Sequence, residues 1–408
     1  MTESFDFDEQ FIRDVIHASE DHGGELGKVV AEHGRRKVAQ LLVEEVISRA
    51  APAINDTPVL IEFAISDGER VLTYYLRVEK GEPVALAAQG DGFVGMRVEY
   101  ELGELVRELY GPIRERSAGV RGTKLFPYVE RDSAFEQMGS YFLATQQATQ
   151  TLLEGCSSVK PNLSELSSRY ITPKFGSLHW FTPHYDRHFR EYRGEQVRVL
   201  EIGIGGYRVP TSGGGSLRMW KHFFPRGQVY GLDIVDKSHV NEPRITALQG
   251  DQSDAESLNR IAEQHGPFDI IIDDGSHINQ HVLASFAHLF PHVKPGGLYV
   301  IEDMWTAYWP GFGGNVDPAA SSGTSLGLLK SLIDAIQHQE LPETAGRQPS
   351  YADQNVVGVH AYHNVAFIEK GRNAEGGVPP WIPRDFESLV AASSGEPLPQ
   401  ETSSHKAP

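Results

Sequence analysis

The sequence predicts a two-domain α/β protein: a doubly wound, mostly parallel sheet with helices on both faces, closed by an antiparallel pair and preceded by an α+β domain. Three observations favour this fold class. From residue 197 onward, short apolar runs alternate with helical segments. Several of these runs end in acidic residues, as strands do where a parallel sheet binds ligands. The chain has 408 residues, which is more than one ordinary domain needs.

The composition of the chain disfavours nucleic acid and membranes as partners. The chain has 37 Lys and Arg against 55 Asp and Glu, a net charge of -18, and such a surface repels nucleic acid. No apolar run reaches the ~18 residues that a membrane helix requires, so we expect no membrane partner. The acidic N-terminus does not resemble a secretory signal, and the single cysteine, Cys156, suits a reducing compartment. We therefore expect a cytoplasmic enzyme or binding protein.

Residues 1–153 are predicted to form the α+β domain, with a role in oligomerisation or in covering a substrate. Apolar residues recur at helical spacing in one segment, and strand-like runs follow it, two of them separated by Ser66, Asp67 and Gly68. Residues 112–135 are expected to be irregular, and residues 154–168 to be the linker to the next domain. The expected helices are 38–49, 102–109 and 135–153, and the expected strands are 59–65, 71–78 and 95–100.

Residues 169–392 are predicted to form the second, doubly wound domain. A short connection at His363 and Asn364 predicts the closing antiparallel pair. The tail, residues 393–408, has little apolar content and is expected to be disordered. The expected strands are 197–202, 229–232, 245–249, 269–273, 298–301, 356–362 and 365–370.

The first strand of this domain leads into a glycine-rich loop. It ends in Glu201, and Gly203 and Gly205 follow, while a second glycine run at 213–215 precedes Ser216. Glycines after a strand allow the backbone to approach a ligand closely, although many turns contain such pairs. The third glycine of the dinucleotide-binding pattern is missing, which disfavours a nicotinamide dehydrogenase.

Acidic residues also follow the second and third strands. Asp233 stands where a carboxylate accepts hydrogen bonds from ribose hydroxyls. Asp251 follows the third strand and could, with Gln252, face an adenine ring. A helix N-cap is the alternative role for either aspartate. Together with the glycine loop they indicate an adenosine-bearing cofactor, and the acidic lining favours S-adenosylmethionine, whose sulfonium is cationic.

The fourth and fifth strands end in a cluster of acids with one histidine. Asp274 and His277 follow one strand, and Glu302 and Asp303 follow the other. Three carboxylates suit a hard ion such as Mg²⁺, or Mn²⁺, which would lower the pKa of a bound hydroxyl. His277 could then remove the proton; a solvent-exposed loop histidine is the alternative. Asp273 is expected to orient the loop or to cap the following helix.

An aromatic run follows this cluster. Trp305, Tyr308 and Trp309 could form an apolar wall for a large ligand or could pack in the core. The segment 311–323, rich in Gly and Ser, comes next and could act as a lid.

Over most of residues 177–370, the sequence resembles the deoxysugar O-methyltransferases of macrolide and polyketide biosynthesis. The resemblance implies a class I S-adenosylmethionine-dependent methyltransferase fold, Mg²⁺ as second cofactor, and a homotetramer with an auxiliary N-terminal domain. It implies Asp274, Glu302 and Asp303 as metal ligands and His277 as general base. Thr182, in the segment 178–189, is a weaker candidate for the cofactor site. The implied cofactor-binding residues are Glu201, Gly203, Ser216, Asp233, Asp251 and Gln252. The matching segments are EIGIGGY, GGGSLRMWKHFFPRGQVYGLDIVDKS, GDQSD, DDGSHINQH and GGLYVIEDMWTAYWPGFGG.

The sequence therefore predicts methyl transfer from S-adenosylmethionine to a deoxysugar hydroxyl on a glycosylated polyketide. The 2-hydroxyl is favoured because a vicinal diol can chelate the ion, and rhamnose is a plausible sugar. One alternative is a metal-dependent O-methyltransferase of catechols or similar aromatics. Another, from a different class, is a catalytically silent methyltransferase-like binding module.

Overall fold

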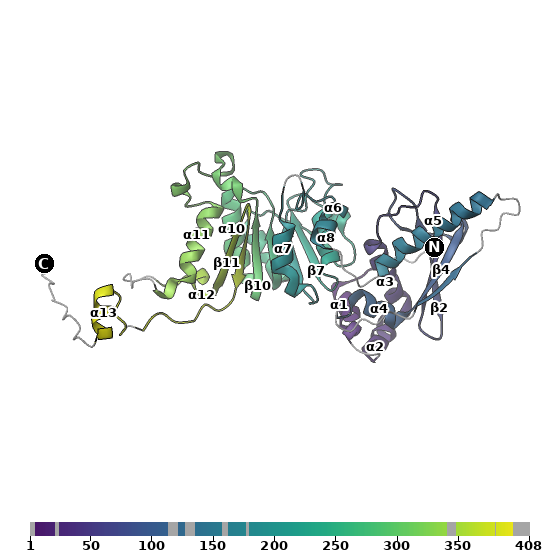
Figure 1. Ribbon diagram of the computed structural model, residues 1–408, viewed down its shortest axis with the longest axis horizontal. Coiled ribbons are helices and arrows are strands. Elements are labelled where there is room, and N and C mark those ends of the chain that lie inside the picture. Colours follow the sequence, from purple (N-terminus) through teal and green to yellow (C-terminus); the bar gives the residue numbers. More distant parts are fainter. Residues whose placement is uncertain are drawn as a thin grey trace.

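The computed structural model describes residues 5–20, 24–112, 121–126, 135–156, 162–176, 179–340, 348–379 and 381–394. These residues form two lobes that lie side by side along the longest axis of the molecule (Figure 1). Each lobe contains one β-sheet, of five strands in the N-terminal lobe and seven in the other. No helix among the described residues is long and apolar enough to cross a membrane.

The N-terminal lobe is built on a sheet with the order β3-β2-β1-β4-β5. Only the β1/β4 pair is parallel. One core joins the sheet to the helices through Leu42, Phe63, Leu105 and Ala148, all nearly or fully buried. The strands are β1 (Val59–Ser66), β2 (Val71–Val78), β3 (Ala85–Ala87), β4 (Val94–Glu101) and β5 (Arg121–Leu125), and the helices that contribute these core residues are α3 (Arg35–Arg49), α4 (Leu102–Tyr110) and α5 (Phe135–Cys156).

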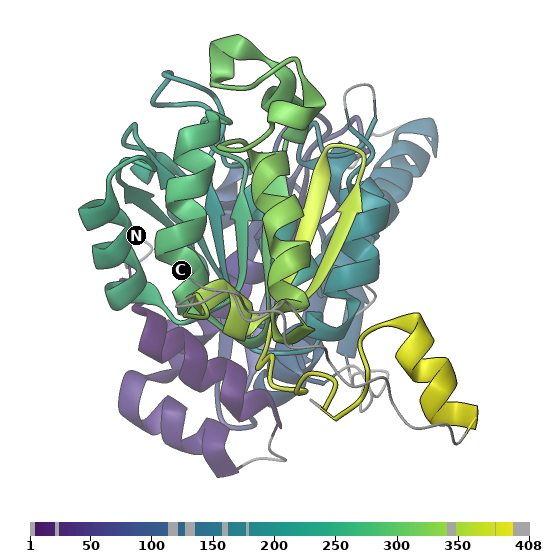
Figure 2. The same ribbon diagram turned by 90° about the vertical axis from the view of Figure 1, so that its left-hand side faces the viewer.

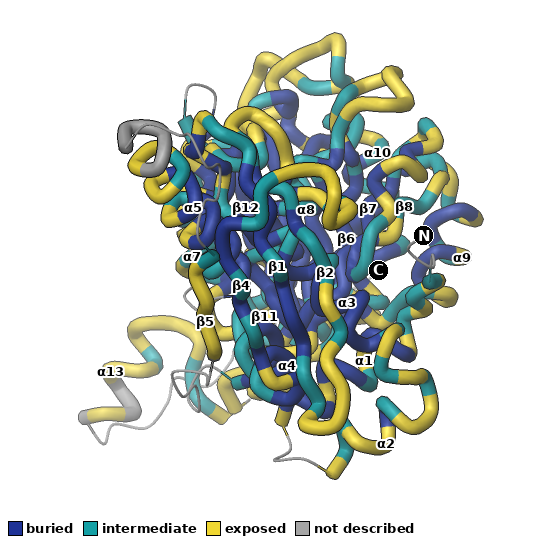
Figure 3. Tube along the Cα trace, turned by 90° about the vertical axis from the view of Figure 1, so that its right-hand side faces the viewer, coloured by how far each residue is buried: buried dark blue, intermediate teal, exposed yellow. Residues whose placement is uncertain are grey.

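Most elements expected in this lobe are present, but β5 is a correction. Residues 112–135 were expected to be irregular, whereas Arg121–Leu125 pairs antiparallel with β4. The strand was missed because RGTKL is a polar edge strand without apolar alternation; Figure 3 shows β5 as exposed beside the buried β4. Helices α1 (Glu9–His17) and α2 (Gly24–His33) were also not anticipated. The boundary between the domains, at 154–168, remains a prediction; α5 extends to Cys156, and residues 157–161 lie outside the described residues.

The second lobe has the predicted doubly wound architecture. Its sheet has the order β11-β12-β10-β9-β6-β7-β8. The strands from β10 to β8 are parallel, and β12 runs antiparallel to both β10 and β11, as expected for the closing pair. The strands are β6 (Arg198–Ile202), β7 (Gln228–Asp233), β8 (Ile245–Gln249), β9 (Phe268–Asp273), β10 (Val293–Glu302), β11 (Val356–Tyr362) and β12 (Val365–Lys370).

Helices cover both faces of this sheet, each over its own apolar core. Figure 2 shows α10 and α11 in front of the sheet. The α10 face has a core that includes Leu258, Phe286 and Leu332. The opposite core includes Tyr185 and Trp220. The helices are α6 (Leu163–Arg169), α7 (Thr182–Phe189) and α8 (Gly215–Phe223) on one face and α9 (Ala255–His265), α10 (Asn279–Leu289) and α11 (Ser325–Ile336) on the other.

The C-terminal part extends beyond the sheet. Helix α13 (Phe386–Ser394) follows the last strand, so the start of the expected tail at 393 is helical. The rest of that prediction, residues 395–408, lies outside the described residues. The proposed lid, 311–323, contains only short 3-10 turns and is mostly exposed.

Buried ion pairs join the two lobes. Glu45 of α3 has no solvent exposure and accepts hydrogen bonds from the guanidinium of Arg244, including one of 3.1 Å from Nε. Arg49 Nε also donates to Glu45, at 2.7 Å, and Lys221 Nζ lies 3.8 Å from it. Burial would raise the pKa of Glu45, but Arg244, Arg49 and Lys221 hold that pKa far below its usual value. The carboxylate is therefore charged and joins the N-terminal lobe to the second lobe.

Candidate active site

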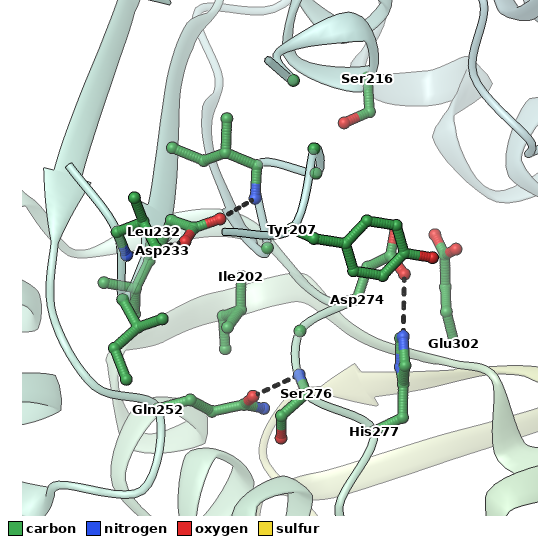
Figure 4. Close-up of a pocket in the computed structure, with 18 of the residues that line it drawn as sticks. Ile202, Tyr207, Ser216, Leu232, Asp233, Gln252, Asp274, Ser276, His277 and Glu302 are labelled. Carbon is green, nitrogen blue, oxygen red and sulfur yellow. Dashed lines mark hydrogen bonds and ion pairs between the residues drawn. The ribbon is translucent and has the colours of Figure 1, made fainter. Parts of the chain in front are cut away.

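A cavity of about 870 Å³ opens at the carboxyl ends of strands β6 to β10. This is where a doubly wound sheet binds its ligands. Figure 4 shows side chains from the loops after these strands pointing into this space. Of the residues predicted from the sequence, those that line the cavity are Gly203, Ser216, Asp233, Asp251, Gln252, Asp274, His277, Glu302 and Asp303.

The glycine loop after β6 packs against the loop after β9. Gly203 has φ +94°, and a Cβ on it would lie 2.1 Å from the carbonyl oxygen of Asp274. Only glycine fits there, because the left-handed φ and the close approach both exclude a side chain. Asp233 Oδ2 accepts a hydrogen bond from Ile204 N at 3.1 Å, and its Oδ1 accepts one from Val235 N at 2.9 Å. Asp233 thus orders the glycine loop from the neighbouring strand and caps no helix.

Asp251 and Gln252 line the cavity after β8 in different ways. Asp251 Oδ1 accepts hydrogen bonds of 2.7 Å from both the backbone N and the hydroxyl of Ser253, and these bonds lower the pKa of Asp251. The N-cap of α9 is Asp254, so Asp251 does not hold that role. Gln252 is buried; it donates to Asp273 Oδ1 at 2.6 Å and accepts from Ser276 N at 2.9 Å. It therefore holds the β9 loop in place beneath the cavity.

Two of the predicted cofactor residues do not line the cavity. Glu201 is fully buried behind it and accepts a hydrogen bond of 2.5 Å from Ser216 Oγ. Thr182 is 1% exposed, and its hydroxyl is hydrogen-bonded to Ser164 at 2.8 Å. The structure therefore gives no support to Thr182 as a cofactor contact, because its polar group is already occupied away from the cavity.

A buried lysine connects the acids of three strands. Lys174, 1% exposed, donates to Asp274 Oδ2 at 2.7 Å and to Glu302 Oε1 at 2.6 Å, and its Nζ lies 3.2 Å from Glu201 Oε1. Burial would lower the pKa of Lys174, but the three carboxylates hold it well above its usual value. Sequence analysis missed this residue, since a single lysine in the segment Thr172-Pro173-Lys174 carries no motif.

Glu302 is held from a second side by a tyrosine. The fully buried hydroxyl of Tyr185, on α7, donates to Glu302 Oε1. Burial and the charge of Asp274 raise the pKa of Glu302 well above its usual value, while Lys174 and Tyr185 oppose that rise. Tyr185 was not predicted either, because its contact with Glu302 depends on how α7 packs against β10.

The histidine and the last acid of the cluster lie together. His277 Nε2 is 3.4 Å from Asp303 Oδ2 and 4.0 Å from Asp274 Oδ1. His277 and Asp303 have φ of 56° and 54°, a left-handed conformation that is uncommon for residues other than glycine and is often found at functional sites. His179 Nε2, which sequence analysis missed, lies 3.4 Å from Asp303 Oδ1. Burial lowers the pKa of His179 and raises that of Asp303.

Asp273 supports this loop from below. It is 1% exposed and accepts hydrogen bonds from Ser285 Oγ at 2.8 Å and Tyr299 Oη at 3.2 Å. Burial raises the pKa of Asp273 to about 6. The N-cap position of α10 is Ile278, so Asp273 orients the loop and does not cap the helix.

The donors present fit a hard divalent ion. Atoms of Asp274, His277 and Asp303 lie within 4.8 Å of one another, and so do those of Glu201, Asp274 and Glu302. The buried Asp303 Oδ1 has no hydrogen-bond partner among the described residues. Carboxylate oxygens with a free acceptor site are the ligands that Mg²⁺ prefers. Lys174 contacts Asp274 through Oδ2 and Glu302 through Oε1.

The aromatic run is a half-exposed stack beside the site. The rings of Trp305 and Trp309 are stacked with centroids 5.6 Å apart, and Trp305 lies 5.3 Å from His179. Tyr308 and Trp309 are 43% and 46% exposed, so this run is not part of the core.

The chain resembles known methyltransferases along its whole length. Residues 12–121 match the family described as MycE methyltransferase N-terminal. The chain is 65% identical to mycinamicin VI 2''-O-methyltransferase of Micromonospora griseorubida, over 97% of this chain and 99% of the relative. It is 64% identical to demethylmacrocin O-methyltransferase of Streptomyces fradiae, over 94% and 97%. The solved structure of MycE methyltransferase from the mycinamycin biosynthetic pathway with Mg, SAH and mycinamycin VI has a TM-score of 0.89 and 65% identity, covering 95% of this chain and 100% of that one.

Proposed function

The chain belongs to the MycE-like family of deoxysugar O-methyltransferases of macrolide and polyketide biosynthesis and is an S-adenosylmethionine- and Mg²⁺-dependent sugar O-methyltransferase; within that activity we propose that it methylates a 2-hydroxyl. The observation that carries the proposal is the meeting of ligand atoms of Asp274, His277 and Asp303 within 4.8 Å of one another in the cofactor cavity, with Glu302 in a second such group that shares Asp274. The family and both cofactors agree with the expectations from sequence. The catechol, dehydrogenase and silent-module alternatives are set aside.

We propose these roles for the residues of the site. Asp274, Glu302 and Asp303 hold the ion, which when bound supplies a Lewis acid that lowers the pKa of the sugar hydroxyl. His277 Nε2 accepts the hydroxyl proton while the oxygen attacks the methyl carbon of the sulfonium. Asp303, 3.4 Å from that nitrogen, stabilises the imidazolium that forms. Gly203, Ser216, Asp233, Asp251 and Gln252 build the cofactor side of the cavity.

The choice of hydroxyl rests on two supports. The relative that is 65% identical is named as a 2''-O-methyltransferase, so its name specifies the 2''-hydroxyl. A vicinal diol that includes the 2-hydroxyl can also offer two oxygens to one ion. The two relatives near 65% identity point to a glycosylated macrolide acceptor such as mycinamicin VI or demethylmacrocin, and rhamnose stays a candidate sugar.

An assay with a panel of glycosylated polyketides, including mycinamicin VI and demethylmacrocin, tests this function. We expect a mass gain of one methyl group, lost on adding EDTA and restored by Mg²⁺. His277→Ala should lower kcat by about 10²–10⁴-fold. His17→Ala is the matched control, since His17 is an exposed histidine on α1 of the N-terminal lobe and does not line the cavity. Activity that resists EDTA, or that survives in the His277 variant, contradicts the mechanism.

The assembly is a further proposal. Family resemblance indicates a homotetramer in which the N-terminal domain takes part. Phe142 and Leu143, adjacent on α5, are 52% and 58% exposed and give that domain an apolar surface for such a contact. Light scattering of the purified protein should give four times the mass of the 45.2 kDa chain, and a monomer would contradict the proposal. We place the enzyme in the cytoplasm.

A further inference from the structure

A second cluster of metal-ligating side chains lies away from the active site. His188 on α7, His360 on β11 and Glu369 on β12 have ligand atoms that all lie within 4.8 Å of one another. His360 pairs with Phe367 across the two strands, and Gly358 pairs with Glu369. Directly opposed residues share a face of the sheet, so both ligands point to the face that α7 covers. The three residues meet although 181 positions separate the first from the last (369 − 188).

The arrangement is held by its neighbours. The ring of His188 stacks on Phe367 with centroids 4.3 Å apart, and its Nε2 lies 3.0 Å from the hydroxyl of Tyr362. A Cβ on Gly358 would come 2.8 Å from Glu369 Oε2, so the glycine leaves room for the carboxylate. His360 Nε2 and Glu369 Oε1 are already 2.7 Å apart. These contacts order the group before any ligand binds, which reduces the entropy lost on binding.

The imidazole of His188 is in the neutral form that binds metals. Burial, and next the proximity of His360, lowers the pKa of His188 to about 4, so its ring is neutral at physiological pH. The ring centroids of His188 and His360 are only 4.6 Å apart, a contact that two cations would oppose. The side chains of His360 and Glu369 are 37% and 42% exposed, so an ion can reach them from solvent.

We propose that His188, His360 and Glu369 form a binding site for a Zn²⁺-class divalent ion, distinct from the oxygen-rich site of the reaction. Two imidazole nitrogens and one carboxylate are a common ligand set for Zn²⁺, whereas Mg²⁺ prefers oxygen alone. Ligand atoms about 2.0–2.2 Å from one ion stand roughly 3.4 Å apart, so only small side-chain rotations are needed. The ion would tie α7 to the closing pair, and α7 also carries Tyr185, which holds Glu302.

Calorimetric titration with Zn²⁺ tests the site. The full-length, tag-free protein is first saturated with Mg²⁺ and S-adenosylhomocysteine. Wild type should bind one Zn²⁺ more than His360→Ala or Glu369→Gln, or bind it about 100-fold more tightly. Any Zn²⁺ that enters the Mg²⁺ site cancels in the comparison, because Asp274, Glu302 and Asp303 are unchanged. His363→Ala, an exposed histidine in the turn between the same strands, is the matched control and should behave as wild type.

Thermal melting gives an independent readout. Zn²⁺ should raise the melting temperature of wild type and of His363→Ala but not of His360→Ala. An ion that binds the folded protein stabilises it against unfolding, and His360→Ala lacks the site. Circular dichroism checks that each variant is folded. We expect each to fold, because the side chains of His360 and Glu369 are partly exposed to solvent. Equal Zn²⁺ stoichiometry and equal melting shifts in wild type and in the His360 and Glu369 variants would overturn the proposal.

Discussion

Lys174 Nζ lies 2.6 Å from Glu302 Oε1, in the buried centre of the active site. The same ammonium group contacts Asp274 and Glu201, so one built-in cation joins the cofactor side of the site to the metal side. Three carboxylates this close would repel one another strongly without it. Lys174 is therefore a positioning residue, which holds two metal ligands while the ion is absent.

Replacing Lys174 by methionine should destabilise the metal-free protein by about 3–5 kcal/mol, because buried charges lose their partner. Added Mg²⁺ should then raise the melting temperature more than in wild type, since the ion restores positive charge. Melting curves in EDTA and in Mg²⁺ measure both effects. Lys294→Met is the control: Lys294 is 38% exposed and pairs with Asp269, and its loss should cost less than about 1 kcal/mol. Equal Mg²⁺-induced shifts in wild type and Lys174→Met would contradict this role.

Removing the Tyr185 hydroxyl tests the support of Glu302. Tyr185→Phe keeps the ring packing against Trp220 and Phe367 but loses the hydrogen bond to Glu302. We expect Mg²⁺ affinity to fall by about 10–100-fold and S-adenosylmethionine affinity to stay unchanged. Calorimetry measures both. Tyr192→Phe is the control. It loses a hydrogen bond to the carbonyl of Gly296, which lies in the first half of β10 whereas Glu302 ends that strand, and it should leave both affinities unchanged. An unchanged Mg²⁺ affinity in Tyr185→Phe would rule out the support.

Neutralising Glu45 should weaken the contact between the lobes. Glu45→Gln leaves Arg244 and Arg49 buried without their counter-ion, and we expect a loss of about 3–5 kcal/mol in the free energy of unfolding. Urea denaturation measures it. Glu44→Gln, at the adjacent position where the carboxylate contacts Gln40, should cost less than about 1 kcal/mol. Equal losses in the two variants would show that the buried ion pairs contribute little.

Acidification should destabilise the protein through His222. Burial, then the charges of Arg49 and Arg169, lowers the pKa of His222 well below its usual value. Below about pH 6.5 the unfolded chain therefore binds a proton at this histidine that the folded chain does not. The free energy of unfolding consequently decreases as the pH is lowered. His222→Asn should flatten the decline in melting temperature between about pH 7.5 and about pH 5.5. His363→Asn, on an exposed turn, should not, and an unchanged slope in His222→Asn would contradict the assignment.

The fold and the acids of the site could be predicted because they follow local rules. Strands β6, β7, β9 and β10 are apolar runs with Glu201, Asp233, Asp273 and Glu302 at or next to their carboxyl ends, and parallel strand ends meet at one rim. The polar edge strand β5 lacks such a pattern and was missed.

The supporting residues of the site could not be predicted from pattern. Lys174, His179 and Tyr185 reach the cluster only through tertiary packing of segments that carry no motif. Thr182 as a cofactor contact stays a prediction, and its hydroxyl is hydrogen-bonded to that of Ser164. Spacing along the chain indicates which strand end a residue follows and does not indicate which way a helix presents its side chains.

The most direct test of the mechanism is a crystal structure of the protein with Mn²⁺, S-adenosylhomocysteine and mycinamicin VI, with the ion located by its anomalous signal. The account predicts that Asp274, Glu302 and Asp303 coordinate the ion and that a sugar 2-hydroxyl completes its coordination within hydrogen-bond reach of His277 Nε2. An ion bound elsewhere, or a sugar whose 2-hydroxyl points away from both the ion and His277, would contradict it.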